Sequence, residues 1–311
     1  MDDSSLWTGL EYKQSLRYGE NPQQKAMWLV YKDHGLSSAN QLQGKELSYN
    51  NLIDLDAAVA TVKEFPDEPA AVVIKHTNPC GVAIGETIDS ALTRALDSDR
   101  VSCFGGIIAL NREVNIECAD ELIGAFYECI VAPSFSDEAK EILSTKKNLR
   151  LLELDIDNIQ LKPYNVRSIL GGVLVQEKDN EPVNIDDWKV VSEREPTVQE
   201  LIDLTFAWKV CRHVRSNAIL VASNGATLGV GAGQMNRVGS ANIALNSADV
   251  NGAALASDGF FPFGDTVRLA YEYGIKAVIQ PGGSIKDQDS IDACNELGMT
   301  MIFTGKRHFL H

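Results

Sequence analysis

The sequence predicts an α/β fold with a mainly parallel or mixed sheet, arranged as two domains. Between residues 70 and 135, short apolar runs typical of buried strands alternate with segments of helical periodicity, which indicates βαβ units. Strands are expected at 70–75, 106–110 and 130–133, and helices at about 87–97 and 116–127. The length of 311 residues exceeds one typical domain, so two domains of about 150 residues each are expected.

The composition is that of an ordinary folded protein, with 44% hydrophobic and 23% charged residues. No apolar run approaches the roughly 20 residues needed to span a bilayer, so no membrane association is expected. The six cysteines are scattered without a C-x-x-C pair, which indicates a reducing, cytoplasmic location. The net charge of −15 argues against non-specific binding of nucleic acid. An anionic ligand would therefore need locally concentrated cations.

Capping and turn signals place the remaining elements. A helix is expected after residues 44–51, because apolar residues recur at helical spacing until Pro66. Thr197 and Glu200 have the spacing of a capping box at the start of another helix. Asn224-Gly225 lies between two apolar runs and predicts a hairpin.

Two compositional breaks, at 144–150 and 177–196, flank a short strand candidate at 172–176. The rhythm of strands and helices restarts after them. We therefore expect a domain boundary near residue 165, which divides the chain into 1–165 and 166–311.

Lys75 and His76 follow the apolar run 70–74, at the end of a predicted buried strand. The next residues, Asn-Pro-Cys-Gly at 78–81, are interpreted as a tight turn. Ligands of open α/β sheets bind at the carboxyl ends of strands, where a lysine and a histidine can combine a positive charge with a base. A Lys–His pair closing a solvated loop fits the same eight residues.

Further candidates combine glycine with a cation or an aromatic ring, and each has a purely structural alternative. Arg17-Tyr18-Gly19 is either a phosphate contact or a surface loop. Phe104-Gly105 offers a flat ring beside accessible backbone, although a core phenylalanine is the commoner outcome. The aromatic and acidic loop 257–265 either holds a flat heterocycle or plugs a core. Residues 229–237 lack the dinucleotide fingerprint, so NAD-binding and Walker-type sites are rejected.

These pieces together resemble one known family in order along the chain. The matching motifs are LRYGENPQQ, GKELSYNNLIDLDAA, IKHTNPCGVAIG, FGGIIALNREV, SNAILV, GVGAGQMNR, SDGFFPFGD and RHFLH. They resemble the transformylase portion of the bifunctional purine-biosynthesis proteins that complete inosine monophosphate, and the resemblance covers roughly residues 13 to 311. It implies two tandem cytidine-deaminase-like three-layer units with mixed sheets, used without zinc. The H-x-E and P-C-x-x-C motifs of zinc deaminases are missing, because Asn78 and Ala83 stand at their key positions.

The resemblance implies transfer of a formyl group from 10-formyltetrahydrofolate to the 5-amino group of 5-aminoimidazole-4-carboxamide ribonucleotide (AICAR). Lys75, His76 and Asn217 match the family's catalytic positions. His76 would take a proton from the amine, Lys75 would stabilise the oxyanion or protonate the leaving folate nitrogen, and Asn217 would position the formyl oxygen. The matching substrate-binding positions are Arg17, Tyr18, Gly19, Phe104, Gly105, Arg237, Phe260, Phe263, Asp265 and Arg307.

The arginines at 17 and 307 would hold the nucleotide phosphate, and the aromatic residues would frame the rings and the folate. Glu128 stands where some relatives have Asp. Three departures from the family pattern are Gln23 in place of His, Cys103 in place of a smaller residue, and Gly264 in place of Arg. The last would weaken folate binding.

The resemblance also implies a homodimer with shared active sites and, in some relatives, a potassium ion near the C-terminus. The cyclohydrolase motifs of the bifunctional proteins are missing from the sequence, so we expect a stand-alone transformylase or an excised domain without cyclohydrolase activity. Ring closure would then need a separate IMP cyclohydrolase. Two alternatives stay open: a related folate- or nucleotide-dependent transferase acting on another aminoimidazole, and a non-catalytic, nucleotide-binding relative.

Overall fold

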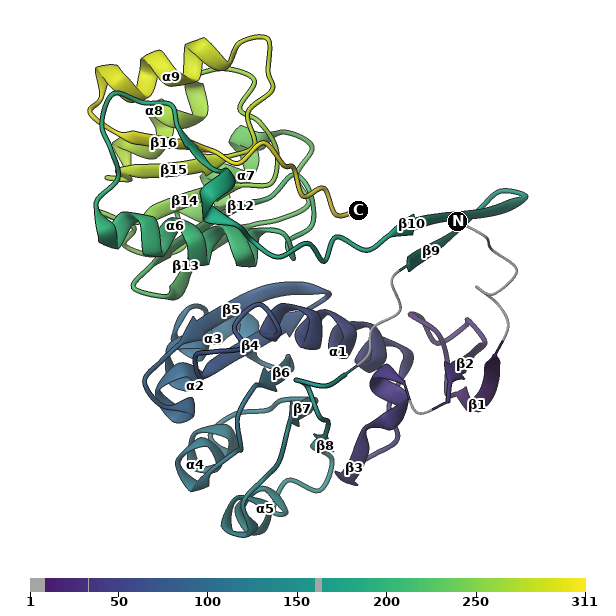
Figure 1. Cartoon of the computed structure of the whole chain (residues 1–311). Helices are drawn as coiled ribbons and strands as arrows, with labels where there is room; N and C mark the ends of the chain where they lie inside the picture. Colours follow the sequence, from purple (N-terminus) through teal and green to yellow (C-terminus); the bar gives the residue numbers. More distant parts are fainter. Residues whose placement is uncertain (1–8, 33, 160–163) are drawn as a thin grey trace.

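The computed structural model describes residues 9–32, 34–159 and 164–311. Figure 1 shows two α/β lobes, one built from residues before 160 and one from residues after 164, with two β-hairpins beside them. The C-terminal segment returns toward the space between the lobes (Figure 1). Within the described ranges, no helix is both long and apolar enough to cross a membrane.

The N-terminal lobe begins with a separate hairpin, β1 (Leu10–Leu16) and β2 (Ala26–Tyr31), followed by the short helix η1 (Gly35–Ser38). Its strands are β3 (Asn40–Gln43), β4 (Ala70–Lys75), β5 (Asn78–Ile84), β6 (Ile107–Leu110), β7 (Cys129–Ala132) and β8 (Arg150–Glu153). Its helices are α1 (Tyr49–Val62), α2 (Ile88–Asp97), α3 (Arg100–Cys103), α4 (Ile116–Ile123) and α5 (Asp137–Leu143).

A second hairpin, β9 (Tyr164–Ile169) and β10 (Gly172–Glu177), precedes the C-terminal lobe, followed by η2 (Ile185–Asp187). The strands of this lobe are β11 (Lys189–Val190), β12 (Ile219–Ser223), β13 (Ala226–Gly231), β14 (Ala254–Ser257), β15 (Ala277–Gln280) and β16 (Thr300–Phe303). Its helices are α6 (Val198–Cys211), α7 (Arg237–Leu245), α8 (Asp265–Glu272) and α9 (Asp287–Glu296).

Among the described residues, twelve strands form one mixed sheet in the order β11-β16-β15-β14-β12-β13-β5-β4-β6-β7-β8-β3. The two lobes repeat one pattern: a hairpin, an antiparallel neighbour, and then parallel strands. In the first lobe, β4 pairs antiparallel with β5 and β6, and β6, β7 and β8 run parallel. In the second, β12 pairs antiparallel with β13 and β14, and β14, β15 and β16 run parallel. The prediction of an α/β fold with a mixed sheet is confirmed.

The two lobes meet where β13 pairs with β5, at Ala226 and Ala83. Ile84 N donates to Gly225 O at 2.9 Å, and Val82 N donates to Thr227 Oγ1 at 3.0 Å. On one face of the sheet, α1 and α6 contribute to a single buried cluster that includes Leu55 and Trp208. On the other face, the helices α2, α4 and α5 form one cluster with the sheet, and α7, α8 and α9 form another. The sheet is therefore covered on both faces.

The predicted strands at 70–75, 106–110 and 130–133 correspond to β4, β6 and β7, and the helix at 87–97 corresponds to α2. The helix predicted over 116–127 ends earlier, at Ile123. The capping box is confirmed, since Glu200 N donates to Thr197 Oγ1 at 3.2 Å and Thr197 N donates to Glu200 Oε2 at 2.8 Å. The hairpin at Asn224-Gly225 is also confirmed, with φ angles of 51° and 68° that suit its turn.

The tight turn predicted at residues 78–81 is wrong, because these residues belong to strand β5. The chain reverses one step earlier, at His76 and Thr77, whose φ angles are 51° and 62°. Pro79 is accommodated opposite Ile74, next to an irregularity in the register of β4 and β5. Gly81 has a packing role, since a Cβ there would lie 1.9 Å from Ala95 O in α2.

Candidate functional site

A cavity of about 660 Å³ lies in the N-terminal lobe, where β4 ends. It brings together five of the residues predicted to be catalytic or substrate-binding: Arg17, Tyr18, Lys75, His76 and Gly105. Its other walls come from the segment before α1, from α1 itself, and from the residues that lead into β7 and β8. The remaining lining residues include Lys45, Asn50, Asn51, Asp54, Phe126, Glu128, Asn148 and Arg150.

Lys75 is fixed at the end of β4 by the loop that precedes β6. Its Nζ donates a hydrogen bond to the carbonyl oxygen of Phe104. The next residue, Gly105, has a φ of 70°, and a Cβ there would lie 3.2 Å from Lys75 Nζ. Glycine is therefore required both for this backbone conformation and for the approach of the ammonium group. Phe104 stays 58% exposed, with its ring centroid 5.6 Å from that of Phe126.

His76 is exposed in the turn between β4 and β5. Thr77 N donates to Asp54 Oδ1 of α1 at 2.7 Å, and Asn78 Nδ2 donates to His76 O at 3.1 Å. Burial raises the pKa of Asp54 above its usual value, although the Thr77 amide and the charges of His76 and Lys75 act against the shift. A partly buried carboxylate therefore lies beside the predicted catalytic pair and lines the same cavity.

Arg150 and Glu128 form another charged part of the cavity wall. Arg150 Nη1 lies 2.7 Å from Glu128 Oε2, and Arg150 Nε donates to Glu46 O at 3.1 Å. The arginine is largely buried, whereas the side chain of Glu128 is 36% exposed. The sequence singled out Glu128 but not Arg150, and the structure makes the two an ion pair.

The loop after β1 carries Arg17, Tyr18 and Gly19. The guanidinium of Arg17 is exposed and lies 5.4 Å from the Tyr18 ring centroid. Gly19 is buried, and its N donates to Gln24 O at 2.7 Å, which closes the loop. Gln23, one of the departures from the family pattern, is exposed next to this contact.

Asn217 lies in the C-terminal lobe, just before β12, and the described residues that line the cavity do not include it. Its Oδ1 accepts a hydrogen bond from Arg237 Nη2 at 2.9 Å, and its Nδ2 donates to Gln234 O at 2.9 Å. Arg237 also donates to Ser257 Oγ at 2.8 Å and forms an ion pair with the fully buried Asp258. Arg237 is thereby fixed beside Asn217.

Arg215 connects this second group to the His76 turn. Its backbone N donates to Asn78 Oδ1 at 2.9 Å, and its Nε donates to Thr77 Oγ1 at 3.2 Å. Two residues later the chain reaches Asn217. The two predicted catalytic segments, which are far apart in sequence, are therefore joined by direct hydrogen bonds across the lobes.

Phe260, Phe263, Asp265 and Arg307 are exposed and lie outside the described lining of the cavity. Lys286 Nζ lies 4.5 Å from the Phe263 ring centroid, and the Arg307 guanidinium lies 4.7 Å from that of Phe309. Asp265 accepts from Thr266 N at 2.7 Å. Phe261, between the exposed rings, is completely buried in the core of the C-terminal lobe. This loop therefore contributes one ring to the core and leaves Phe260 and Phe263 exposed to solvent.

The other two departures have packing roles in this chain. A Cβ at Gly264 would lie 2.7 Å from Asp289 O, so glycine allows α8 and α9 to approach closely here. Cys103 is buried, with its Sγ 3.8 Å from Cys80 Sγ. Among the described residues, no group of three His, Cys, Asp or Glu side chains could hold a metal ion.

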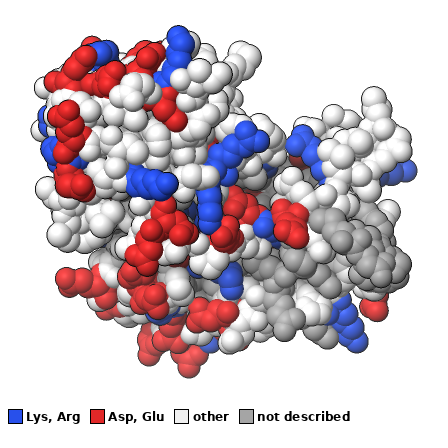
Figure 2. All heavy atoms as spheres, turned by 45° about the horizontal axis from the view of Figure 1, so that its top comes forward, with Lys and Arg blue, Asp and Glu red and all other residues white. Residues whose placement is uncertain are grey.

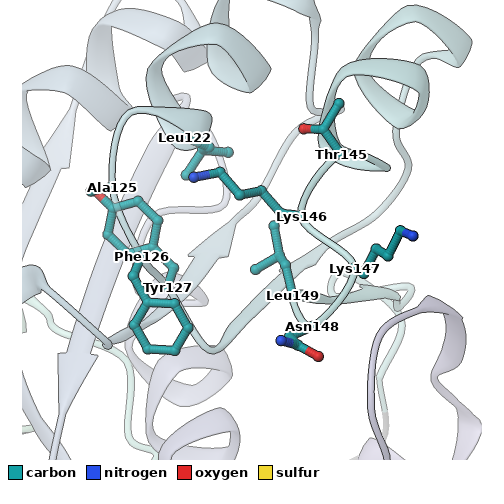
Figure 3. A pocket seen from close by; sticks show the side chains of 9 residues that line it. All are labelled: Leu122, Ala125, Phe126, Tyr127, Thr145, Lys146, Lys147, Asn148 and Leu149. Atoms are coloured by element: carbon teal, nitrogen blue, oxygen red, sulfur yellow. The ribbon is translucent and has the colours of Figure 1, made fainter.

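Two further cavities adjoin the site. One, of about 340 Å³, shares Phe126 and Asn148 with the large cavity. Figure 3 shows the side chain of Lys146 extending toward Leu122, with the rings of Phe126 and Tyr127 below the end of the lysine in this view. The other, of about 230 Å³, shares Lys75 and is lined by Cys80, Ser98 and Asp99.

Figure 2 shows patches of Asp and Glu on the upper left and lower left of one face, with Lys and Arg near its middle and around its edge. This distribution agrees with the net charge of −15. Against that background, the large cavity contains four cationic side chains, Arg17, Lys45, Lys75 and Arg150, and three carboxylates, Glu46, Asp54 and Glu128. The cavity is thus less acidic than the chain as a whole.

Asp54, Arg150, Phe126 and Arg215 were missed by sequence reasoning. A signal for Asp54 was present, because Asn50, Asn51 and Asp54 recur at helical spacing on α1 and all three line the cavity. We see no comparable sequence signal for Arg150 or Arg215, whose partners are far away along the chain.

Comparison with known proteins gives a family match over residues 3–247, to the family described as AICARFT/IMPCHase bienzyme. The bifunctional purine biosynthesis protein PurH of Parasynechococcus marenigrum is 61% identical over 99% of this chain and 61% of its own length. The protein of the same name from Prochlorococcus marinus strain NATL1A is also 61% identical, over 97% of this chain and 61% of its own length. The chain thus spans about three fifths of the length of these relatives.

One prediction is overturned by this comparison. The resemblance led us to expect a separate IMP cyclohydrolase and no cyclohydrolase activity in this protein. The matching family is a bienzyme whose description names both activities, and the relatives are named bifunctional, so the need for a separate cyclohydrolase was wrongly predicted. The match over more than half of the chain and the high identity lead to one conclusion: this chain belongs to the AICARFT/IMPCHase bienzyme family.

Proposed function

We propose that this chain transfers the formyl group of 10-formyltetrahydrofolate to the 5-amino group of AICAR, giving formyl-AICAR and tetrahydrofolate. The observation that carries the proposal is the cavity of about 660 Å³, where Lys75 and His76 face the same space as Arg17 and Tyr18. A phosphorylated aminoimidazole needs a cation for its phosphate and a base near its amine, and this cavity holds both. Family membership supports the same reaction.

The proposed chemistry assigns each catalytic residue one step. The amine attacks the formyl carbon, and His76 takes the proton that the amine loses, directly or through the neighbouring carboxamide. The formyl oxygen becomes an oxyanion, which Lys75 stabilises and Asn217 orients. When the carbon–nitrogen bond to the folate breaks, the folate nitrogen receives a proton, for which Lys75 is the proposed donor.

The remaining substrate contacts are proposed to be shared between two copies of the chain. Phe260, Phe263, Asp265 and Arg307 lie outside the described lining of the cavity. A homodimer would supply them to each site from the second subunit. The β9–β10 hairpin supports this proposal, because Ile169, Leu170 and Leu174 on it are exposed apolar residues that a partner subunit would cover.

The repeated strand order in the two lobes supports two tandem cytidine-deaminase-like units, divided near residue 165. The folate as co-substrate, a potassium ion near the C-terminus and a cytoplasmic location stay predictions. A related transferase acting on another aminoimidazole and a non-catalytic nucleotide-binding protein stay the alternatives.

The test is an assay of tetrahydrofolate release with AICAR as acceptor, beside two close analogues: one without the 5-amino group and one without the phosphate. Formation of tetrahydrofolate and formyl-AICAR with AICAR alone supports the proposal. Faster turnover of another aminoimidazole favours the first alternative, and tight AICAR binding without turnover favours the second. Formyl-AICAR offered to the same protein tests the ring closure named for the family.

A further inference from the structure

Two residues from different lobes hold the turn that carries His76. We propose that Asp54 and Arg215 are positioning residues, which keep His76 and Thr77 in their left-handed conformation and so place the His76 ring and the Lys75 ammonium at the cavity. The catalytic part of this inference rests on the proposed function. The structural part, that these two residues fix the turn, stands independently.

The turn needs such support because its backbone is unfavourable. His76 and Thr77 have φ angles of 51° and 62°, in the left-handed region that residues other than glycine and asparagine rarely occupy. Thr77 is β-branched, which makes this conformation especially disfavoured. The other hairpin in the corresponding place, between β12 and β13, uses Asn224 and Gly225 at its turn. The His-Thr turn therefore depends on contacts from outside the hairpin.

Asp54 provides the first contact. Its Oδ1 accepts the hydrogen bond of Thr77 N at 2.7 Å, across 23 residues of sequence. The carboxylate is held in place by α1, whose next residue, Leu55, is completely buried in the core. An anionic acceptor on a helix gives a short, directional bond to a backbone amide of the turn.

Arg215 provides the second contact from the C-terminal lobe. Its Nε donates to Thr77 Oγ1 at 3.2 Å, and its backbone N donates to Asn78 Oδ1 at 2.9 Å. Asn78 in turn fixes the backbone of His76, because its Nδ2 donates to His76 O at 3.1 Å. Arg215 O accepts from Gly233 N at 2.8 Å, which ties the arginine to the segment after β13. Thr77 is thereby held at its backbone by one lobe and at its side chain by the other.

This arrangement assigns the two residues a role distinct from substrate binding. The His76 ring follows the backbone of its turn, and Lys75 is the adjacent residue on β4. A small rotation of the turn would displace the base from the amine while leaving the phosphate contact at Arg17 in place. Loss of the support should consequently reduce kcat much more than it changes the KM for AICAR.

The experiment compares Asp54→Ala, Asp54→Asn and Arg215→Ala with the control Asp56→Ala in the full chain. Asp56 is an exposed carboxylate on the same helix. Asparagine keeps an oxygen that can accept the Thr77 N–H, so Asp54→Asn should rescue most of the activity. We expect Asp54→Ala to reduce kcat by at least about tenfold with a KM within about threefold, because misplacement of reacting groups lowers the rate of the chemical step.

Arg215→Ala should give a smaller loss of kcat, because its backbone bond to Asn78 remains, and it keeps the test valid if Asp54→Ala does not fold. Asp56→Ala should have wild-type kcat and KM. Equal kcat for wild type, Asp54→Ala and Arg215→Ala would overturn the positioning role. An Asp54→Asn variant as inactive as Asp54→Ala would also contradict it, since acceptance of the Thr77 amide would then not be what matters.

A second measurement does not depend on activity. In protein labelled with ¹⁵N-threonine, the Thr77 amide should be shifted downfield and protected from hydrogen exchange in wild type and Asp54→Asn, and both signatures should be lost in Asp54→Ala. An unchanged Thr77 amide in Asp54→Ala would overturn the structural part of the inference. Failure of wild-type protein to form tetrahydrofolate from AICAR would instead count against the proposed function, while the amide signal still tests the turn.

Discussion

Arg237 donates a hydrogen bond from Nη2 to Asn217 Oδ1 at 2.9 Å, while its Nη1 binds Ser257 and the buried Asp258. Arg237 thus pairs with the fully buried carboxylate of Asp258 and also orients the side-chain amide of Asn217, a predicted catalytic residue. Asn217 Nδ2 is engaged with Gln234 O, so both ends of the amide are fixed. Arg237, a proposed substrate-binding residue, therefore also stabilises the fold around Asp258.

Replacing Arg237 should destabilise the protein strongly. Arg237→Ala leaves Asp258 buried without its cationic partner, and breaking such a pair costs about 3–5 kcal/mol. Thermal or urea unfolding measures the loss. Arg268→Ala is the matched control, because Arg268 forms an exposed pair with Glu296 that should contribute less than about 1 kcal/mol. Equal losses in the two variants would contradict the account of Asp258.

Gly105→Ala should reduce both stability and turnover. The φ of 70° disfavours alanine by about 1–2 kcal/mol, and the added methyl would lie 3.2 Å from Lys75 Nζ. We expect a lower melting temperature and a kcat reduced by about tenfold or more, because Lys75 must shift. Gly172→Ala serves as a control, since nothing lies within 4 Å of a Cβ at that position. A fully active Gly105→Ala would show that the lysine tolerates this contact.

Glu64 should contribute to stability in a pH-dependent manner. Burial alone would raise its pKa, but hydrogen bonds and charges from His213 and Arg212 lower the pKa below its usual value. A lowered folded-state pKa stabilises the protein above the unfolded value of about 4.3 and stops doing so as the pH falls through the folded-state pKa.

The measurement is the free energy of unfolding of wild type and Glu64→Gln between about pH 3 and pH 7. Wild type should exceed the variant most at the neutral end, and the difference should shrink toward the acidic end. Glu195→Gln changes an exposed carboxylate and should show a small, nearly constant difference. A constant difference for Glu64→Gln would refute the assigned pKa shift.

Arg307→Ala should weaken the binding of AICAR. Arg307 is exposed beside Phe309 and is proposed to contact the nucleotide phosphate from a second subunit. We expect the KM for AICAR to rise about tenfold, equivalent to about 1.4 kcal/mol, with kcat changed less. An AICAR analogue without its phosphate should be insensitive to the substitution. An unchanged KM for AICAR itself would count against the phosphate contact.

Local signals in the sequence predicted local structure well. The apolar run of β4, the capping box of α6 and the Asn-Gly turn each involve neighbouring residues whose physical requirements are visible in the sequence. The Asn-Pro-Cys-Gly segment misled the prediction. Its proline lies in strand β5 beside an irregularity in the register, and its glycine allows α2 to pack closely on that strand.

The cavity itself depended on contacts that no local pattern encodes. Thr77 and Asp54 are 23 residues apart, and Arg215 and Asn78 are 137 apart. Such pairs become neighbours only when α1 packs on the sheet and the lobes join through β5 and β13. The sequence therefore singled out Lys75 and His76 as candidates, and folding supplied the residues that contact their turn.

The central claim, that His76 is the base in formyl transfer, is tested most directly by the turnover of His76→Ala with AICAR and 10-formyltetrahydrofolate. The account predicts a kcat lower by about 100-fold or more, as expected for loss of a general base, with AICAR binding changed by less than about threefold. Near-normal turnover by this variant would contradict it.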